Sequence, residues 1–265
     1  MEEKLILGLD VSTTTIGIAI FKDLGDKGEL IDLNRIKPKP FEKSDIPEHD
    51  NILKAHAFNQ YMVEKYAGLK FDKIIIEEPL YSSNNIYTVS SLRFFNGIVS
   101  YLMWDIFGVK PDYISSSDAR HYGLPETTGI RPKNKKPTRF GCLPMKISGQ
   151  KIDKKLVVLH QVGKRFPELK WFLNKNMTIA DENCDMADAI TCVLGHMSKI
   201  GKWTSQTYSL DNVIEFIAYN IAYKNMVAKL QKDKTKTPDQ KRLLKKQYML
   251  EDFNIQKYIN IEVKI

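Results

Sequence analysis

Long apolar runs are missing from this 265-residue chain, and none approaches the roughly 18 residues that a membrane-spanning helix requires. The opening residues, MEEKLILG, lack the basic region of a signal peptide. Cysteine is scarce, because Cys142, Cys184 and Cys192 are the only three, and they form no C-x-x-C pair. An odd number of cysteines argues against a disulfide framework. We therefore expect a cytoplasmic protein with no membrane partner.

Charge is distributed unevenly along the chain, which has a net charge of +8. Residues 118–176 hold 14 Lys and Arg against four acidic residues, and residues 199–265 hold 13 against seven. Residues 1–117 and 177–198 each have a net charge of −4. Such a split suits a protein that holds a polyanion on one surface and acts on it with an acidic site. Lysines scattered over a solvated surface are the alternative.

The order of the expected elements indicates an α/β fold around a mixed sheet. Apolar spacing predicts helices over residues 50–69 and about 86–107. Short apolar or alternating runs between turn signals predict strands over 4–12, 15–23, 28–36, 71–79 and 112–117.

Residues 118–152 break this pattern, since they combine prolines, glycines and bases without helical or strand periodicity. We interpret this segment as a basic insertion that becomes ordered on binding. Helical patterns resume at 153–169 and 182–200. The tail predicts a helix at about 210–231, a second helix to about 250 and a last strand from 258. We expect a domain over 1–200 and a helical C-terminal extension over 201–265.

Acidic residues occur where apolar residues would be expected. Asp10 stands in an otherwise apolar strand, and Glu77 and Glu78 end the strand IIIEE. Asp185 and Asp188 are three residues apart, so on a helix they share one face. A buried carboxylate without a partner costs several kcal/mol, so each of these acids needs a counter-charge, a metal ion or solvent.

Converging carboxylates repel one another and take up protons unless a divalent cation neutralises them. Two hard cations roughly 4 Å apart activate a water and stabilise the leaving oxygen in phosphodiester hydrolysis. Oxygen ligands select Mg²⁺ or Mn²⁺, and no cluster of His and Cys suggests zinc. We expect Asp10 to hold metal. A capped turn or a strand-edge acid facing water is the alternative.

Four segments resemble parts of the RuvC-type Holliday-junction resolvases of the ribonuclease H-like superfamily. The run LILGLDVSTTTIGIAIF resembles the first hairpin, and FDKIIIEEP resembles the second acidic strand. The run SSNNIYTVSSLRFFNGIVSYLM looks like the helix behind that strand, and DENCDMADAITCVLGH is similar to the closing D-x-x-D helix. The order of these segments matches the family over residues 5–198.

The resemblance implies a mixed five-stranded sheet with its first three strands antiparallel, flanked by helices. It also implies a two-metal endonuclease that uses Mg²⁺, for which Mn²⁺ would substitute, with Asp10, Glu77, Asp185 and Asp188 as catalytic ligands. Glu77 is preferred to Glu78 because it stands where the family's glutamate sits, although Glu78 remains a rival. The basic insertion and the tail have no counterpart in compact bacterial members and are more like viral or phage members.

Basic residues of the insertion are candidates for contacts with backbone phosphate, which give affinity without sequence information. A solvated loop is the alternative. Lys154 and Lys155 start a helix and are candidates to stabilise transition-state charge. Tyr81 is a candidate to stack on or wedge between bases, although packing is commoner for such a residue. The phosphate-contacting candidates in the insertion are Lys133, Lys135, Lys136, Arg139 and Lys146.

We therefore expect a metal-dependent, structure-selective DNA endonuclease. Its expected substrate is a four-way junction, cut by a homodimer through paired nicks with 5′-phosphate ends. Forks, flaps and RNA–DNA hybrids are alternative substrates, because a fold does not decide the substrate. A non-catalytic nucleic-acid-binding protein of the same fold is another alternative. An actin-like sugar or acetate kinase would need a second phosphate-binding Gly/Thr hairpin, which this chain lacks.

Overall fold

The computed structural model describes residues 3–42, 44–79, 85–127, 146–147, 150–174, 178–210, 212–252 and 254–262. The chain divides into two compact units. The first unit consists of Met1–Pro125 and Asp185–Gln206, and the second consists of Glu126–Cys184 and Thr207–Ile265. No helix in the described ranges is long and apolar enough to cross a membrane.

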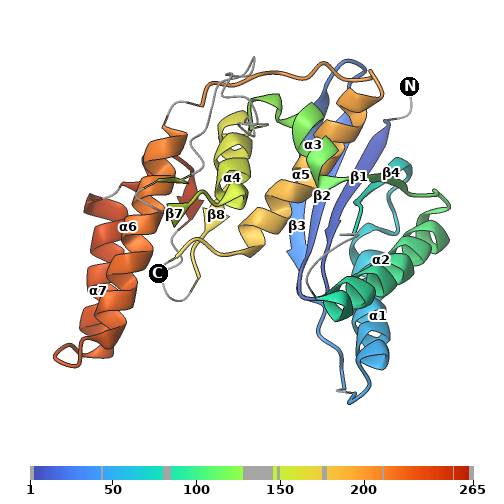
Figure 1. Cartoon of the computed structure of the whole chain (residues 1–265). Coiled ribbons are helices and arrows are strands. Elements are labelled where there is room, and N and C mark those ends of the chain that lie inside the picture. The colour runs from blue at the N-terminus through green and yellow to red at the C-terminus, as the bar shows by residue number, and fades with distance from the viewer. Residues whose placement is uncertain are drawn as a thin grey trace. The chain divides into compact units, whose positions relative to one another are not determined.

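A mixed five-stranded sheet with the order β3-β2-β1-β4-β5 forms the centre of the first unit (Figure 1). The first three strands are antiparallel, whereas β4 runs parallel to β1 and β5 runs parallel to β4. This arrangement confirms the predicted mixed α/β sheet. Its strands are β1 (Leu5–Val11), β2 (Ile16–Asp23), β3 (Gly28–Ile36), β4 (Phe71–Glu77) and β5 (Asp112–Ile114).

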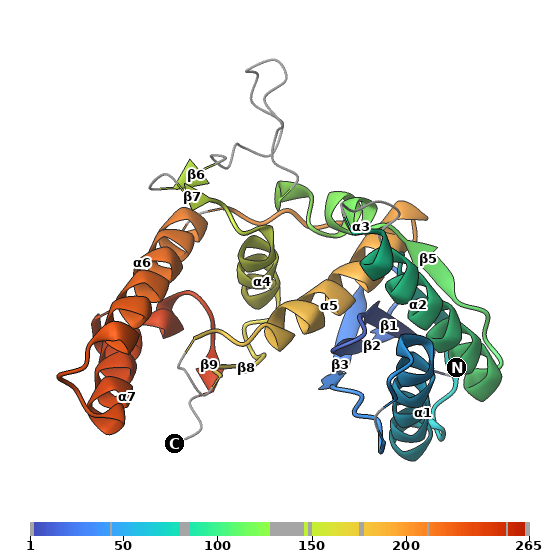
Figure 2. The ribbon, with the colours of Figure 1, turned by 60° about the horizontal axis from the view of Figure 1, so that its bottom comes forward.

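Helices cover both faces of this sheet. One face packs its alternate apolar residues, such as Leu7 and Ile74, against Phe58 and Phe95 of two helices that lie side by side in Figure 2. The other face carries the long helix that contains the two predicted aspartates. The helices of this unit are α1 (Pro47–Tyr66), α2 (Ile86–Phe107), α3 (Ser116–Gly123) and α5 (Glu182–Lys199). The first three residues of α5 belong to the second unit.

Helix α3 corrects the prediction for residues 112–123. The expected strand over 112–117 ends at Ile114, and part of the segment expected to lack periodic structure is helical. The Asp118 N–H donates to Ser115 Oγ at 3.1 Å and caps the helix. Gly123 approaches the backbone of Gly195 in α5 so closely that an added Cβ would lie 2.8 Å from its nitrogen. Tertiary packing of small residues therefore forms a helix that is too short to show a periodic pattern.

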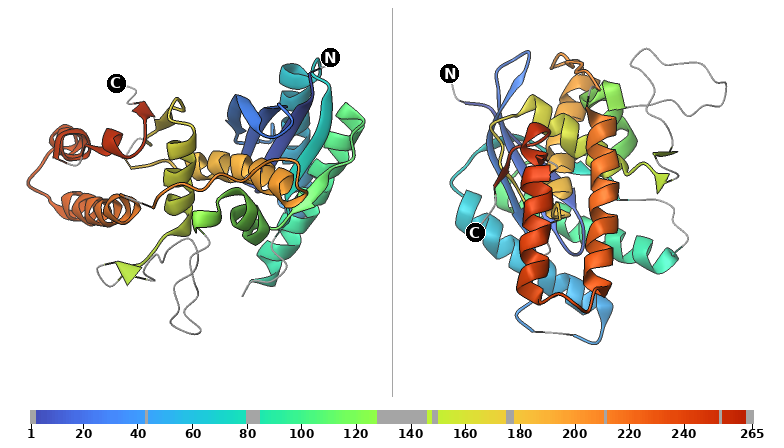
Figure 3. Two further views of the ribbon diagram at one scale, coloured as in Figure 1. Left: turned by 90° about the horizontal axis from the view of Figure 1, so that it is seen from above. Right: turned by 90° about the vertical axis from the view of Figure 1, so that its left-hand side faces the viewer.

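The second unit contains the C-terminal helices, which lie where the tail pattern predicted two helices. Helices α6 and α7 lie side by side as a hairpin in both views of Figure 3. Two short strand pairs, β6 with β7 and β8 with β9, join the unit's segments. The elements are η1 (Pro125–Thr127), which begins one residue before the unit, β6 (Lys146–Ile147), β7 (Gln150–Lys151), α4 (Lys154–Arg165), β8 (Trp171–Phe172), α6 (Val213–Lys232), α7 (Pro238–Gln247), η2 (Tyr248–Asp252), η3 (Ile255–Lys257) and β9 (Ile261–Glu262).

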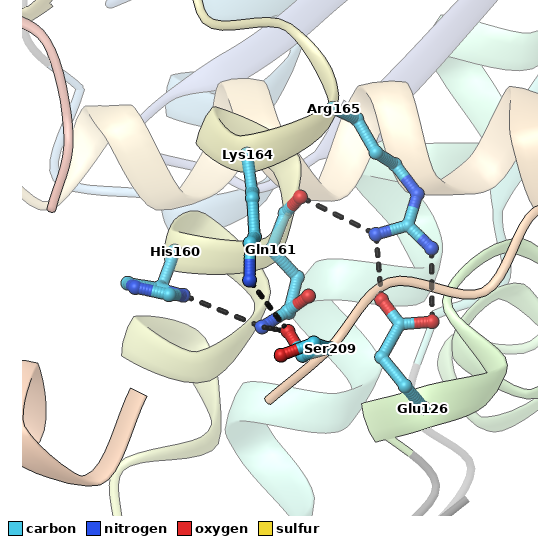
Figure 4. Close-up of polar contacts among 6 residues, drawn as sticks. All are labelled: Glu126, His160, Gln161, Lys164, Arg165 and Ser209. Atoms are coloured by element: carbon cyan, nitrogen blue, oxygen red, sulfur yellow. Dashed lines mark hydrogen bonds and ion pairs between the residues drawn. The ribbon is translucent and has the colours of Figure 1, made fainter. Parts of the chain in front are cut away.

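A buried ion pair joins the beginning of the second unit to the end of α4 (Figure 4). Arg165 donates from Nη1 to Glu126 Oε1 at 2.6 Å and from Nη2 to Oε2 at 2.9 Å. The two side chains are only 6% and 1% exposed, so each charge depends on the other. The Arg165 guanidinium also lies over the Tyr208 ring, and Lys164 donates to the Ser209 carbonyl. These contacts hold residues 208–209 against α4.

The division into units differs from the predicted boundary at residue 200, because residues 126–184 cluster with the tail. Part of the reason is that Trp171 in β8 pairs with Ile261 in β9, and His160 of α4 packs on Phe216 of α6. These partners lie far along the chain, so no local pattern connects them. The prediction of domains over 1–200 and 201–265 remains a prediction.

Candidate active site

Asp10 and Glu77 lie at neighbouring positions of two parallel strands. The register of β1 and β4 pairs Leu9 with Ile76, so the next residue of each strand is Asp10 in one and Glu77 in the other. Leu9 and Ile76 face the core with α1 and α2. Because side chains alternate along a strand, Asp10 and Glu77 face the opposite side of the sheet, which α5 covers.

Two glycines let α5 lie directly on this face. A Cβ on Gly8 would overlap Val193 and lie 2.7 Å from the Ala189 carbonyl oxygen. A Cβ on Gly17 would overlap the backbone carbonyl of Asp185. Gly17 is also the cross-strand partner of Asp10. Because glycines occupy positions 8 and 17, no side chain separates β1 and β2 from α5. The start of α5 therefore lies beside Asp10.

Cys192 of α5 lies beside the predicted ligand Glu77. Its thiol is buried and lies 3.8 Å from Glu77 Oε2. Burial raises the pKa of this thiol well above its ordinary value, and the charges of Glu77, Asp10 and Asp188 raise it further. Three of the predicted ligands thus act on one buried atom, although they come from two strands and a helix.

Asp188 is 5% exposed, and Asp185 lies one turn earlier on the same helix and is half-buried. An Arg120 nitrogen, Nη2, lies 3.8 Å from Asp188 Oδ1 and offsets part of its charge. Arg120 comes from α3, the helix that sequence reasoning missed. The sequence analysis also treated Cys192 as a packing residue, and no motif marks either residue as part of the site.

Glu78 differs from Glu77 in its surroundings. The Glu78 N–H donates to the Ile114 carbonyl at 2.9 Å, and its charge helps raise the pKa of Lys199, after larger contributions from Asp118 and Tyr122. Glu77 instead contacts the Cys192 thiol. Which glutamate is the principal ligand stays a prediction, but only Glu77 raises the pKa of Cys192 in company with Asp10 and Asp188.

The donor set of this site fits a hard divalent cation by its chemistry, because carboxylate oxygens are the ligands that Mg²⁺ and Mn²⁺ prefer. Its present geometry is not a complete coordination sphere. Within the described ranges, no three His, Cys, Asp or Glu side chains form a group that could hold an ion. Side-chain rotation would therefore have to accompany metal binding.

The hydroxyl residues after Asp10 have a structural role. Ser12 Oγ donates to the Thr15 carbonyl at 2.7 Å and accepts from the Thr14 and Thr15 N–H groups. These bonds form the tight turn between β1 and β2. Ser12 is thus committed to the turn that brings Gly17 opposite Asp10.

Lys154 and Lys155 are the predicted nucleic-acid contacts whose side chains the structure describes. Lys154 and Lys155 begin α4 in the second unit and are exposed, and the Lys155 N–H donates to the Asp153 side chain that caps the helix. Their expected role at the scissile phosphate stays a prediction. The remaining candidates, namely Tyr81, Lys133, Lys135, Lys136, Arg139 and the side chain of Lys146, lie outside the described residues.

No protein-family model and no curated protein matches the chain. Among solved structures, it is similar to T. thermophilus RuvC in complex with a Holliday junction substrate, with 13% identity, 75% of this chain and 97% of that chain covered, and a TM-score of 0.45. It is also similar to the yeast mitochondrial Holliday junction resolvase, Ydc2, with 12% identity, coverage of 84% and 83%, and a TM-score of 0.48. An exopolyphosphatase from Cytophaga hutchinsonii matches with 10% identity, coverage of 98% and 94%, and a TM-score of 0.32.

Proposed function

We propose that the chain is a metal-dependent endonuclease that cuts branched DNA. The observations that carry this proposal are the adjacent positions of Asp10 and Glu77 on paired strands and the contact of Glu77 with Cys192 of α5, the helix that contains Asp185 and Asp188. Carboxylates from two strands and a helix would repel one another without a positive partner. Such a site suits a reaction in which hard cations and a phosphodiester meet.

Asp10, Glu77, Asp185 and Asp188 would hold two Mg²⁺ ions, for which Mn²⁺ would substitute. When bound, the two ions supply an activated water and neutralise charge on the phosphate. Asp10 and Glu77 orient the ligand set because strand pairing fixes their spacing. Arg120 holds Asp188 in place through their ion pair. Hydrolysis at phosphorus would leave 5′-phosphate and 3′-hydroxyl ends.

A four-way junction is the proposed substrate, and a homodimer is the proposed form of the enzyme. Support for a homodimer comes from the outer face of α2, where Tyr87, Phe94 and Tyr101 recur every seventh residue and Trp104 follows one turn later. These side chains are 74%, 42%, 62% and 52% exposed. Exposed aromatic side chains that recur along one face of a helix mark an interaction surface. A second copy would cover it symmetrically and supply the second nick.

Asp10→Asn separates this function from its alternatives. The unchanged chain should nick labelled four-way junctions in Mg²⁺, in symmetry-related pairs, and cut forks, flaps and RNA–DNA hybrids more slowly. The variant should lose cleavage but keep junction binding measured in EDTA. Nicking that survives in Asp10→Asn would contradict the proposed site. If the chain cut another branched substrate faster than the four-way junction, that substrate would replace the junction as the proposed one. Cytoplasmic location and viral or phage origin stay predictions.

A further inference from the structure

The turn of the α6–α7 hairpin carries a dense positive charge. Residues 229–246 contain eight Lys and Arg and only two acidic residues, Asp233 and Asp239. This net charge of +6 compares with +8 for the whole chain. The segment comprises the last turn of α6, a short connection and most of α7, which Figure 3 shows beside α6.

Tertiary contacts anchor this hairpin, so its charges are displayed on an ordered element. Tyr223 and Val227 of α6 are buried, and the Tyr223 ring stacks on Tyr248 with 5.9 Å between centroids. At the start of α7, Thr237 and Gln240 form a reciprocal capping box. Ordered charges lose less side-chain and backbone freedom on binding than charges on a flexible tail.

Internal acids neutralise little of this charge. Asp233 pairs with Lys236 at 3.0 Å and accepts hydrogen bonds from Thr235, which together hold the pKa of this carboxyl far below its ordinary value. In the part of the chain that the structure describes, four exposed bases of the hairpin take part in no ion pair: Lys229, Lys232, Lys234 and Arg242. Such a cluster repels itself unless a polyanion binds it.

The surroundings of these bases favour phosphodiester backbone over a lipid surface. A helix that lies in a membrane interface needs a broad apolar face beside its bases. Helix α7 has only ten residues, and its exposed large apolar side chains are Leu243 and Leu244. Lysine and arginine heads need no apolar partner to bind phosphates of a duplex.

We propose that the basic tip of the α6–α7 hairpin, defined by Lys229, Lys232, Lys234 and Arg242, is a second DNA-binding surface. It contacts backbone phosphates of the duplex and extends the footprint of the enzyme without reading sequence. This inference rests on the proposed function only for the identity of the polyanion.

The test replaces all four residues with Gln in the full-length chain and measures binding to a fluorescent duplex by anisotropy, in EDTA, over a range of salt concentrations. Each phosphate contact contributes about 0.9 to the slope of log affinity against log salt. The slope of the variant should therefore be shallower by about 3 to 4. A single change in the connection, Lys234→Glu, should lower the slope by about 1 without touching a helix.

The matched control replaces four exposed lysines of the first unit, Lys27, Lys39, Lys110 and Lys202, with Gln. This control removes the same charge and should lower the slope much less. Equal slopes for the two sets, or an unchanged slope in the hairpin variant, would overturn the inference. So would a hairpin variant that loses binding to phosphatidylserine vesicles but not to DNA. Cleavage by the unchanged chain in Mg²⁺ is scored separately, so the proposed function and this surface can fail independently.

Discussion

The Cys192 Sγ atom of α5 lies 3.8 Å from the Glu77 Oε2 atom at the end of β4, with the thiol as donor. This contact joins residues that are 115 positions apart in the chain. It shows that α5 packs over the end of β4 and not only over β1 and β2. It also gives Glu77 a neutral donor in a region dominated by carboxylates.

Cys192 should be unreactive in the folded protein. Burial and the neighbouring carboxylates raise the pKa of the thiol, so at pH 8 it remains protonated, and only the thiolate attacks alkylating reagents. Iodoacetamide labelling read by peptide mass spectrometry should leave Cys192 unmodified in native protein and modify it fully in urea. Labelling of Cys192 in native protein at the rate of an exposed thiol would contradict the buried position among the acids.

Glu77→Gln should reduce cleavage by more than about 100-fold, since loss of a group that only orients a metal ligand already costs about 10–100-fold. Glu78→Gln is the matched control, because it removes the same charge from the adjacent residue, which does not contact Cys192. Its cleavage rate should be nearly unchanged. Single-turnover rates in Mg²⁺ measure both. If Glu78→Gln were the more damaging change, the assignment of the two glutamates would be reversed.

Gly17→Ala should destabilise the first unit, because its methyl group would overlap the Asp185 carbonyl of α5. Overpacking of this kind costs about 1–3 kcal/mol and would displace the first turn of the helix. Gly68→Ala serves as the control, since a Cβ there would meet no atom within 4 Å. Urea unfolding measures both variants. A Gly17→Ala protein as stable as Gly68→Ala would show that α5 does not lie against β2 this closely.

Stability should depend on pH through His160. Burial, with a smaller effect of the Lys164 charge, lowers the pKa of His160 to about 4. In the unfolded chain the pKa is about 6.5, so as pH falls the unfolded state binds the proton first. The contribution of the neutral imidazole is complete above about pH 6.5 and disappears as pH approaches 4, which amounts to about 3 kcal/mol.

Urea unfolding at several pH values tests this dependence by comparing two histidines. His160→Gln should flatten the loss of stability between pH 6.5 and 4, and His49→Gln, at an exposed position of α1, is the matched control. The two variants remove the same type of group, so any general effect of losing histidine cancels. A parallel pH dependence in the unchanged chain and in His160→Gln would refute the assignment.

The sequence by itself determined the elements whose residues show a regular period. Strand β3 (28–36) and helix α2 (86–107) have the predicted bounds, and β1, β2 and β4 differ by at most two residues at an end. The three-residue spacing of Asp185 and Asp188 also determined that these two acids share one face of a helix. Such patterns are local, because they arise from the geometry of one strand or one helix.

Only the tertiary structure decided which distant residues meet. Parallel pairing brings Asp10 beside Glu77, and glycines in two strands bring α5 close enough to add Asp188 and Cys192. Arg120 reaches Asp188 from a helix too short to have a readable period. The same holds for Glu126 and Arg165, which form a buried ion pair within the second unit. These contacts depend on packing between segments that are remote in the chain, and a sequence pattern records only neighbours.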